Sequence, residues 1–502
     1  MESLGYLLAG FQTAMTLPNL LYCLIGVCFG QVVGILPGLG PTAGTALLLP
    51  LTFSLEPVSA IIMLAGIYYG AMYGGTITSV LINTPGEAAS LVTCFDGYQL
   101  AKQGRAGTAL GISAIGSFIG GVVALLGLIL IGPVVARQAL KFGPPEFFAL
   151  VCLGFALLLG LTGKSLLKGL LGAIFGLSLS FIGQDLNSGV IRFAFGITDL
   201  AGGFDFIPIA MGMFGLSELL LNAEEKLGAN AEMPGKVKEL LPKPEEWKPA
   251  MKAMGRGSAI GFILGLIPGT TATIATILSY STEKKLSKTP SRFGKGALEG
   301  VAGPEAANNA YCGGALIPLF TLGIPTAPTM AVLLGAFVMH GLTPGPMLFQ
   351  RNPDIVWGII ASMFIGNTLL LLMNLPLANV WAKITTVPFR LLFPIIFIIM
   401  IVGTYSLNNS LFDVGALLVF GVIGYILKKA DFPLAPIILA YVLGDLMEKT
   451  LLQSLTMFKG NFFAFFTRPL SGTILVIAIT AILYSVISSI RNKRWIASED
   501  EA

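Results

Sequence analysis

Two interrupted apolar segments constrain the fold of this chain more than any other feature. Residues 26–45, GVCFGQVVGILPGLGPTAGT, recur in altered form at residues 257–276, GSAIGFILGLIPGTTATIAT. The identical pairs are Gly26/Gly257, Gly30/Gly261, Gly34/Gly265, Pro37/Pro268, Gly38/Gly269, Thr42/Thr273 and Thr45/Thr276. A Pro-Gly pair interrupts a helix. Two interrupted apolar segments in corresponding positions are typical of membrane transporters built from two repeats, whose binding site lies where the interruptions meet.

The composition indicates an integral membrane protein. Of 502 residues, 55% are hydrophobic and only 11% are charged, and the mean hydropathy is +0.83. In soluble proteins the charged residues alone make up about 25%. Apolar stretches recur that match the roughly 20 residues a membrane-spanning helix needs. We predict crossings near 107–131, 145–161, 165–183, 205–222, 354–377, 388–407, 411–427, 432–448 and 470–490.

Basic loops set the predicted orientation, because lysine and arginine favour the cytoplasmic side. The stretches 223–256 and 282–299 are rich in both residues and should be cytoplasmic. The 26 residues between them, 256–281, are too short for two crossings. They should therefore form a re-entrant hairpin. One crossing, at 57–95, separates the first copy of the repeat from the cytoplasmic Lys102, so the first hairpin should open to the opposite face.

These features predict an all-α polytopic membrane protein with two inverted-topology repeats, each containing a re-entrant hairpin and a broken helix. The expected parts are a first repeat with an N-terminal segment (1–222), a charged cytoplasmic linker (223–256), a second repeat (257–469), and a C-terminal helix with a cytoplasmic tail (470–502). Weaker matches pair Ala71, Gly74 and Gly75 with Ala310, Gly313 and Gly314, and Pro85 with Pro325. We interpret the glycines at every fourth position in the two hairpins as surfaces for close packing of the hairpin arms.

Four interruptions in apolar sequence carry the candidate site: GILPGLGPTAGT (34–45), INTPGEA (82–88), GLIPGTTAT (265–273) and GIPTAPT (323–329). Irregular backbone at membrane depth is tolerated only inside protein or beside a water-filled cavity. Free N–H groups at helix N-termini suit a carboxylate, whereas free carbonyls and hydroxyls suit Na⁺. The alternative is that the breaks are ordinary kinks whose threonines bond within their own helices; four symmetrically placed breaks disfavour it.

We predict substrate contacts from Asn83, Thr84, Gly86, Thr326 and Thr329, with Thr42 and Thr273 close by. The candidates for the coupling ion, with a possible Na⁺ at the broken-helix loops, are Pro37, Gly38, Thr45, Glu87, Pro268, Gly269, Thr276, Glu305, Asn308 and Asn309. An ionisable residue in a membrane segment is a functional candidate by default. The alternative role for Glu305, weighed equally, is to cap a helix near the cytoplasmic face. One of the two adjacent asparagines should point inward.

Other apparent motifs fail. The triplet Gly163-Lys164-Ser165 lacks the first glycine of a P-loop, since Leu158 stands there. The five cysteines form no CxxC pair and have no neighbouring histidine, so we expect them to be core residues and not metal ligands or disulfides. We expect no enzymatic activity, no cofactor besides a coupling ion, and no nucleic-acid partner. Two other function classes compete. One is the membrane subunit of an ATP-driven permease, in which the basic linker would dock the nucleotidase; the inverted repeat disfavours it. The other is a passive channel, which the interruptions at the midplane disfavour.

Long motifs extend this interpretation: PGLGPTAGTALLLPLTF, IYYGAMYGGTITSVLINTPGEAASLVTCFDGYQLAKQGRAG, FGPPEFFAL, GPEAANNAYCGGALIPLFTLGIPTAPTMA and GLTPGPMLF. With these the chain resembles, over essentially its whole length, the TctA family of large permease subunits of bacterial tripartite tricarboxylate transporters. The resemblance implies a multi-pass secondary transporter of the bacterial inner membrane, coupled to Na⁺ or H⁺, that imports carboxylates such as citrate.

The resemblance also implies two partners, a small membrane subunit of the TctB kind and a periplasmic solute-binding protein of the TctC kind. Thr326 departs from the family pattern, in which glycine is expected. By analogy with other carboxylate transporters that have paired hairpins, we expect an elevator motion.

Overall fold

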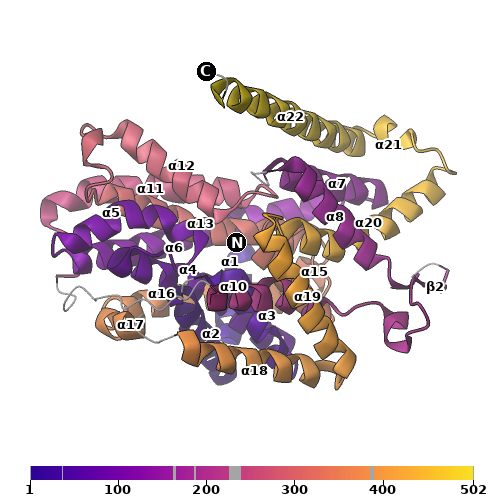
Figure 1. Ribbon diagram of the computed structural model, residues 1–502, viewed down its shortest axis with the longest axis horizontal. Coiled ribbons are helices and arrows are strands. Elements are labelled where there is room, and N and C mark those ends of the chain that lie inside the picture. The colour runs from indigo at the N-terminus through magenta and orange to yellow at the C-terminus, as the bar shows by residue number, and fades with distance from the viewer. Residues whose placement is uncertain are drawn as a thin grey trace.

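The protein is almost entirely helical (Figure 1). The computed structural model describes residues 2–36, 38–161, 165–185, 188–224, 239–384 and 389–500. Within these residues, eight helices are long and apolar enough to cross a membrane. These stretches are Leu17–Ile35, Pro57–Ile82, Ala106–Ala139, Phe206–Glu224, Pro353–Asn374, Leu391–Asn408, Leu411–Lys429 and Pro469–Ile487. The expected all-α polytopic membrane protein is therefore confirmed.

The first half of the chain supplies the helices α1 to α10. Their bounds are α1 (Glu2–Ala14), α2 (Leu17–Ile35), α3 (Gly40–Leu48), α4 (Pro57–Ile82), α5 (Leu91–Lys102), α6 (Ala106–Ala139), α7 (Pro144–Leu161), α8 (Leu166–Ser180), α9 (Phe206–Ala210) and α10 (Ser217–Glu224). Short turns accompany them: the 3-10 turns η1 (Leu49–Thr52), η2 (Ala88–Ser90) and η3 (Thr198–Gly202), and the π-helical η4 (Met211–Leu216). Strands β1 (Gly183–Gln184) and β2 (Ile191–Arg192) form a small antiparallel pair.

The second half supplies α11 to α22. Their bounds are α11 (Pro244–Gly265), α12 (Ala272–Leu286), α13 (Glu299–Leu322), α14 (Pro328–Met339), α15 (Leu348–Arg351), α16 (Pro353–Asn374), α17 (Ala378–Ile384), α18 (Phe389–Asn408), α19 (Leu411–Lys429), α20 (Ala435–Met457), α21 (Ala464–Thr467) and α22 (Pro469–Asp500), with the 3-10 turn η5 (Pro290–Arg292). Every predicted crossing corresponds to helical structure, although α7, α8 and α20 are not among the eight spans above.

Helices α4 and α13 form the centre of the fold. Both are buried on all sides along nearly their whole length. A helix that is apolar or small on every face belongs inside a bundle. Proline starts α4, where a missing N–H costs nothing. Pro304 and Pro318 are tolerated inside α13, because neighbouring helices in a membrane bundle can satisfy the freed backbone groups.

Both central helices end in the same way. Asn83 caps α4 in the left-handed conformation, with φ of 55°. Gly323, 240 positions later, caps α13 with φ of 70°. Glycine and asparagine are the two residues that adopt this conformation at low cost. A proline follows each cap two residues later, so the chain cannot re-enter a helix at once.

Glycine rows hold α2 against α4 and α11 against α13. A methyl group added to Gly30 would lie 2.4 Å from the carbonyl oxygen of Ile67, and one added to Gly261 would lie 2.0 Å from that of Ala307. The same contact recurs for Gly26 with Met63, Gly34 with Ala71, Gly257 with Gly303, and Gly265 with Tyr311. The glycines thus allow backbone-to-backbone packing. Their main partner is the following long helix and not the other arm of the hairpin.

These contacts differ by one residue from the weaker sequence matches of this region. A methyl group added to Gly74 would lie 2.3 Å from the carbonyl oxygen of Gln31. The residue in the same relation to the second half is Gly314, where an added methyl group would lie 2.5 Å from the carbonyl oxygen of Phe262. By these contacts Gly74 corresponds to Gly314, at a separation of 240, one residue away from the Gly313 with which the sequence comparison paired it.

The second interrupted segment is longer than expected. Helix α11 begins at Pro244 and not near residue 256, so it crosses the boundary drawn between the linker and the second repeat. Lysines and glutamates in its first turns do not end a helix, because they are solvated there. Thr271 then starts α12 as its N-cap, accepting a hydrogen bond from the N–H of Ile274 at 3.3 Å.

Asp96 ties the two halves of the chain together. Its side chain is fully buried on α5. One oxygen accepts hydrogen bonds from the N–H groups of Gly294, Gly296 and Ala297 at 2.9, 2.7 and 2.7 Å. The other accepts from the hydroxyl of Tyr280 at 2.9 Å. A carboxylate of the first half thus organises the loop between α12 and α13.

A second group of helices lies beside this central part. Helix α22 packs against α7, and α20 packs against both α7 and α8. Figure 1 shows α22 along one edge of the molecule. Arg468 donates a hydrogen bond to the buried carboxylate of Glu146 at 2.9 Å and so joins the start of α22 to α7.

Candidate functional site

The first hairpin meets the second broken helix through two threonines. The hydroxyl oxygens of Thr42 on α3 and Thr329 on α14 lie 2.7 Å apart. Helix α12 of the second hairpin packs in turn against η2 of the first break. Each hairpin therefore contacts the break that belongs to the other half. Two residues predicted as substrate contacts are brought together in this way.

Thr326 lies where the second hairpin and the second break meet. Its carbonyl oxygen accepts a hydrogen bond from the N–H of Gly269 at 3.0 Å. Its hydroxyl is fully buried, lies near the hydroxyl of Tyr311, and has no hydrogen-bond partner among the described residues. Tyr311 instead donates to the carbonyl of Thr270 at 2.6 Å. A buried hydroxyl without a partner destabilises a protein by about 1–3 kcal/mol. A ligand oxygen that accepted a hydrogen bond from this hydroxyl would remove that cost.

Glu87 is a buried carboxylate at the first break. It accepts hydrogen bonds from the side-chain amide of Asn308 at 2.9 Å and from the N–H of Ala89 at 3.1 Å. The carbonyl oxygen of the Asn308 amide and the hydroxyl of Tyr68 are buried nearby, and neither has a partner in the described part of the chain. Asn308 is thus the asparagine that points toward the first half. Its neighbour Asn309 donates to the carbonyl of Glu305 on its own helix at 3.3 Å.

Glu305 is not a helix cap. Helix α13 begins six residues earlier, at Glu299, and only 1% of Glu305 is exposed. Its carboxylate accepts hydrogen bonds from three hydroxyls, of Thr93 on α5, Thr76 on α4 at 2.8 Å, and Ser117 on α6 at 3.3 Å. The capping role considered from the sequence is therefore wrong, because its partners belong to three other helices.

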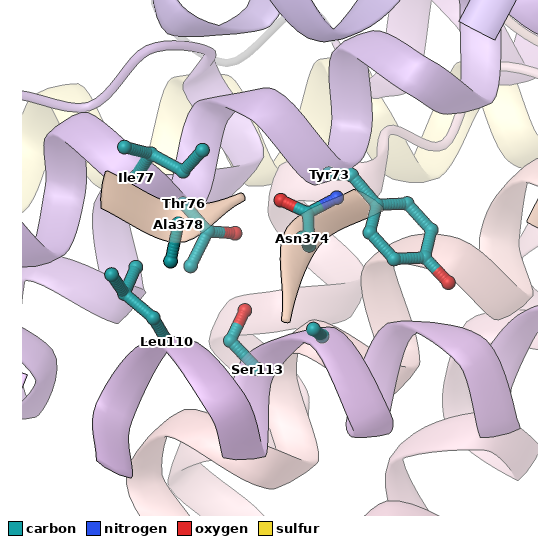
Figure 2. A pocket seen from close by; sticks show the side chains of 8 residues that line it. Tyr73, Thr76, Ile77, Leu110, Ser113, Asn374 and Ala378 are labelled. Atoms are coloured by element: carbon teal, nitrogen blue, oxygen red, sulfur yellow. The ribbon is translucent and has the colours of Figure 1, made fainter. Parts of the chain in front are cut away.

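A small pocket lies next to this carboxylate. Figure 2 shows Thr76 on α4 and Ser113 on α6 on facing sides of it. Thr76 bonds Glu305 directly, and Ser113 also interacts with that carboxylate. The pocket is lined by Tyr73, Thr76, Ile77, Leu110, Ser113, Ala114, Asn374 and Ala378. Asn374 is held by a reciprocal amide pair with Gln31 at 2.9 and 3.2 Å.

Other predicted site residues lie outside these clusters. Asn83 is exposed and serves the backbone as the cap of α4. Thr84 bonds the carbonyl of Ile82 at 3.3 Å. Thr45 and Thr276 donate to carbonyls of their own helices, those of Pro41 and Thr273, at 2.7 and 2.9 Å. For these three threonines the geometry is that of local backbone bonding.

The remaining predictions concern the backbone of the breaks. Gly86 is buried, and a methyl group there would lie 2.0 Å from the carbonyl oxygen of Gly34, so only glycine fits. Gly38, at φ of 88°, lies against the side chain of Asn222 on α10. Pro268 precedes the bonded Gly269 and is half-buried, as is Thr273. Pro37 lies outside the described residues.

The residues that sequence analysis missed are hydroxyls in apolar helices. Thr76, Thr93 and Ser117 surround Glu305, and Tyr68 and Tyr311 lie near Glu87 and Thr326. One signal was present: Ser113 and Ser117 stand four residues apart in an otherwise apolar stretch, which directs both to one helix face. Nothing in the sequence paired that face with Glu305.

Comparison with known proteins gives a consistent assignment. Residues 20–439 match the tripartite tricarboxylate transporter TctA family. The chain is 45% identical over 494 residues, 98% of both sequences, to an uncharacterized 52.8 kDa protein in the TAR-I ttuC' 3' region of Agrobacterium vitis. It is 47% identical over 234 residues to an uncharacterized protein in the TAR-II ttuC' 3' region of the same organism, covering 47% of this chain and 97% of that protein. No solved structure matches the chain.

Proposed function

Because this chain belongs to the tripartite tricarboxylate transporter TctA family, we propose that it is the large membrane subunit of a cation-coupled importer of small carboxylates. The observation that carries the proposal is the contact of each hairpin with the break of the other half, centred on Thr42 and Thr329. Citrate-like tricarboxylates or related organic acids are the proposed substrates. The ATP-driven permease and the passive channel are not favoured by this family.

The proposed substrate site lies between the ends of short helices. Helices α3, α12 and α14 begin at Gly40, Ala272 and Pro328, beside the breaks. Helix N-termini present unpaired N–H groups and a positive partial charge, which attract carboxylates. Thr42, Thr329 and the unpartnered hydroxyl of Thr326 add donors near those ends. A multiply charged acid needs several such donors, because each carboxylate must be satisfied once water is removed.

The proposed coupling ion is Na⁺ or H⁺. Glu87 and Glu305 are buried carboxylates where α13 contacts the first half. Glu87 belongs to the first half and bonds Asn308 of α13, whereas Glu305 belongs to α13 and bonds Thr76 of the first half. Carboxylates at membrane depth commonly mark ion or proton pathways. Import of an anion against its gradient needs such a cation to supply free energy and to offset charge.

The proposed mechanism is alternating access by two inverted repeats. Support comes from the constant separations between corresponding residues of the two halves. Each glycine of the first row is 231 positions from its match in the second row, and each contacted residue on α4 is 240 positions from its match on α13. The left-handed caps Asn83 and Gly323 share the second separation. We propose an elevator motion of the hairpins by analogy with other carboxylate transporters that have paired hairpins.

The proposed setting is the bacterial inner membrane. A small membrane subunit of the TctB kind and a periplasmic binding protein of the TctC kind are the proposed partners, as the family implies. Substrate would be delivered at the periplasmic face by the binding protein and released to the cytoplasm after reorientation.

Counterflow in proteoliposomes tests the proposal. Proteoliposomes that contain the full chain and its small subunit would be loaded with one unlabelled acid. The cognate binding protein and a labelled mono-, di- or tricarboxylate would then be added outside, with and without Na⁺. Exchange of at least one carboxylate is expected, and it should need the binding protein and the presence of the coupling cation. Exchange of none, or uptake that follows ATP and not an ion gradient, would reject it.

A further inference from the structure

Building on the proposed coupling to a cation, we propose that Glu305 and the hydroxyls around it bind one dehydrated Na⁺ ion, at a site separate from that of the substrate. The ligands are the Glu305 carboxylate and the hydroxyl oxygens of Thr76, Thr93, Ser113 and Ser117. They come from α13, α4, α5 and α6. One acidic residue of the second half thus gathers hydroxyls from three helices of the first half.

The charge at this site calls for a cation. Within the residues that the structure describes, no lysine, arginine or histidine forms an ion pair with Glu305. The buried glutamates Glu146 and Glu283 each have an arginine partner. An isolated carboxylate in a water-poor interior is costly, and hydroxyl donors offset only part of that cost. A single positive charge neutralises the site, whereas a divalent ion would leave one charge uncompensated.

The ligand set suits a small hard cation. All of the surrounding groups offer oxygen, which such cations prefer over nitrogen or sulfur. The carboxylate and four hydroxyls provide up to six oxygen atoms. Each hydroxyl can turn its hydrogen away and present a lone pair, since Ser and Thr both donate and accept. The close contacts of 2.8 and 3.3 Å to the carboxylate keep the oxygens near enough to share one ion.

A small pocket lies beside the site, on the side from which we propose that the ion leaves. Thr76 and Ser113 belong both to the pocket wall and to the group of ligands (Figure 2). Leu110, near the start of α6, and Ala378, the first residue of α17, also line it. The predicted orientation puts both positions toward the cytoplasm, which is the side where a co-transported ion leaves.

Ion binding would also act on the substrate site. Thr93 is in the first turn of α5, directly after the break that contains Glu87. Asn308, one turn from Glu305 on α13, holds Glu87. A cation that draws α4, α5, α6 and α13 together therefore fixes the first break in one arrangement. This gives a physical path for coupling between the ion and the carboxylate.

Equilibrium binding of ²²Na⁺ to the purified full chain, without carboxylate and with choline as the balancing cation, tests the site. The wild type should show saturable binding that unlabelled Na⁺ displaces. Glu305→Gln and Thr93→Val should each weaken Na⁺ binding by about tenfold or more, equivalent to about 1.4 kcal/mol. Thr93→Ser keeps the hydroxyl and should bind Na⁺ within about threefold of wild type, and Glu246→Gln, in the first turn of α11, should not change it.

Two results would overturn the site: absence of saturable Na⁺ binding, or normal binding in Thr93→Val. If Glu305→Gln does not fold, the Thr93→Val and Thr93→Ser pair still decides. Failure of the proposed function looks different. In that case no carboxylate is exchanged in proteoliposomes although Na⁺ binding follows the pattern above. Na⁺-driven uptake with unaffected binding in the variants would instead retain the function and reject the site.

Discussion

Thr42 and Thr329 are 287 positions apart in the chain, yet their hydroxyl oxygens are 2.7 Å apart. The pair joins the second arm of the first hairpin to the start of α14. It is a direct side-chain contact between two predicted substrate residues, and it lies beside two helix N-termini. The pair is therefore the first place to test the proposed site.

Thr329→Val removes the hydroxyl and keeps the shape of the side chain. We expect uptake of the transported carboxylate to fall about tenfold or more, corresponding to about 1.4 kcal/mol of lost binding or transition-state stabilisation. Thr329→Ser restores the hydroxyl and should recover most of the uptake. Initial rates in proteoliposomes at matched protein incorporation measure this. Equal rates for the valine and serine variants would remove this hydroxyl from the site.

Gly261→Ala should destabilise the protein by about 1–3 kcal/mol, because its methyl group would lie 2.0 Å from the carbonyl oxygen of Ala307. Gly30→Ala should behave alike, given its 2.4 Å approach to Ile67. Gly255→Ala on the same helix α11 is the control. It meets no atom within 4 Å, and alanine there gains about 0.5–1 kcal/mol of helix propensity. Thermal unfolding in detergent measures this effect. The transition temperature should be lower than in the wild type for the first two variants only.

Asp96→Asn should loosen the loop between α12 and α13. The carboxylate accepts three backbone N–H groups with one oxygen, and charge strengthens each of these bonds. Hydrogen exchange of the amides of Gly294, Gly296 and Ala297 should speed up by about tenfold or more. Tyr280→Phe removes only the bond to the other oxygen and should have a much smaller effect on these amides. Unchanged exchange in Asp96→Asn would show that the loop is held by other contacts.

Glu246 should make the stability of the protein depend on pH. Burial alone would raise the pKa of Glu246, but the hydrogen bonds from Arg105, 2.7 Å away, and from the N–H of Lys243, together with the positive charges of both residues, lower that pKa below its usual range. A carboxyl whose folded pKa is depressed adds stability above its unfolded pKa of about 4.3 and loses it as the pH falls further. Arg105→Gln should therefore cost about 1 kcal/mol or less at pH 7, and the difference from wild type should shrink toward a pH of about 3. Unfolding by denaturant at both pH values measures it.

Much of the fold could be predicted because apolar length and interrupting residues are local properties. The stretch predicted at 411–427 forms α19 from Leu411 to Lys429, and that predicted at 354–377 forms α16 from Pro353 to Asn374. The start of α11 was harder to predict. Charged residues signal the membrane boundary but do not stop a helix, so α11 begins well before the apolar stretch. The contacts of Gly74 resemble those of Gly314 and not those of Gly313, which the sequence could not indicate because adjacent glycines differ only in what they contact.

The candidate site was less predictable because it depends on contacts between distant helices. Sequence analysis identified Thr42, Thr329, Thr326, Glu87 and Asn308 as candidates, and the structure brings these residues into pairs or leaves their polar atoms unpartnered within its described part. The hydroxyls around Glu305 could not be found in this way. Serine and threonine in apolar helices usually bond a carbonyl one turn earlier, as Thr45 does with Pro41. Only the arrangement of α4, α5 and α6 around α13 distinguishes the two cases.

The glycine rows have a consequence for how such a molecule changes shape. Where carbonyl groups of one helix sit directly on the Cα atoms of another, there is no layer of side chains that could switch rotamers and let the helices slide. Helices α2 and α4, and likewise α11 and α13, are thus rigid mechanical units. Any hinge has to be sought elsewhere: at the breaks themselves, or along the looser side-chain contacts with the outer helices.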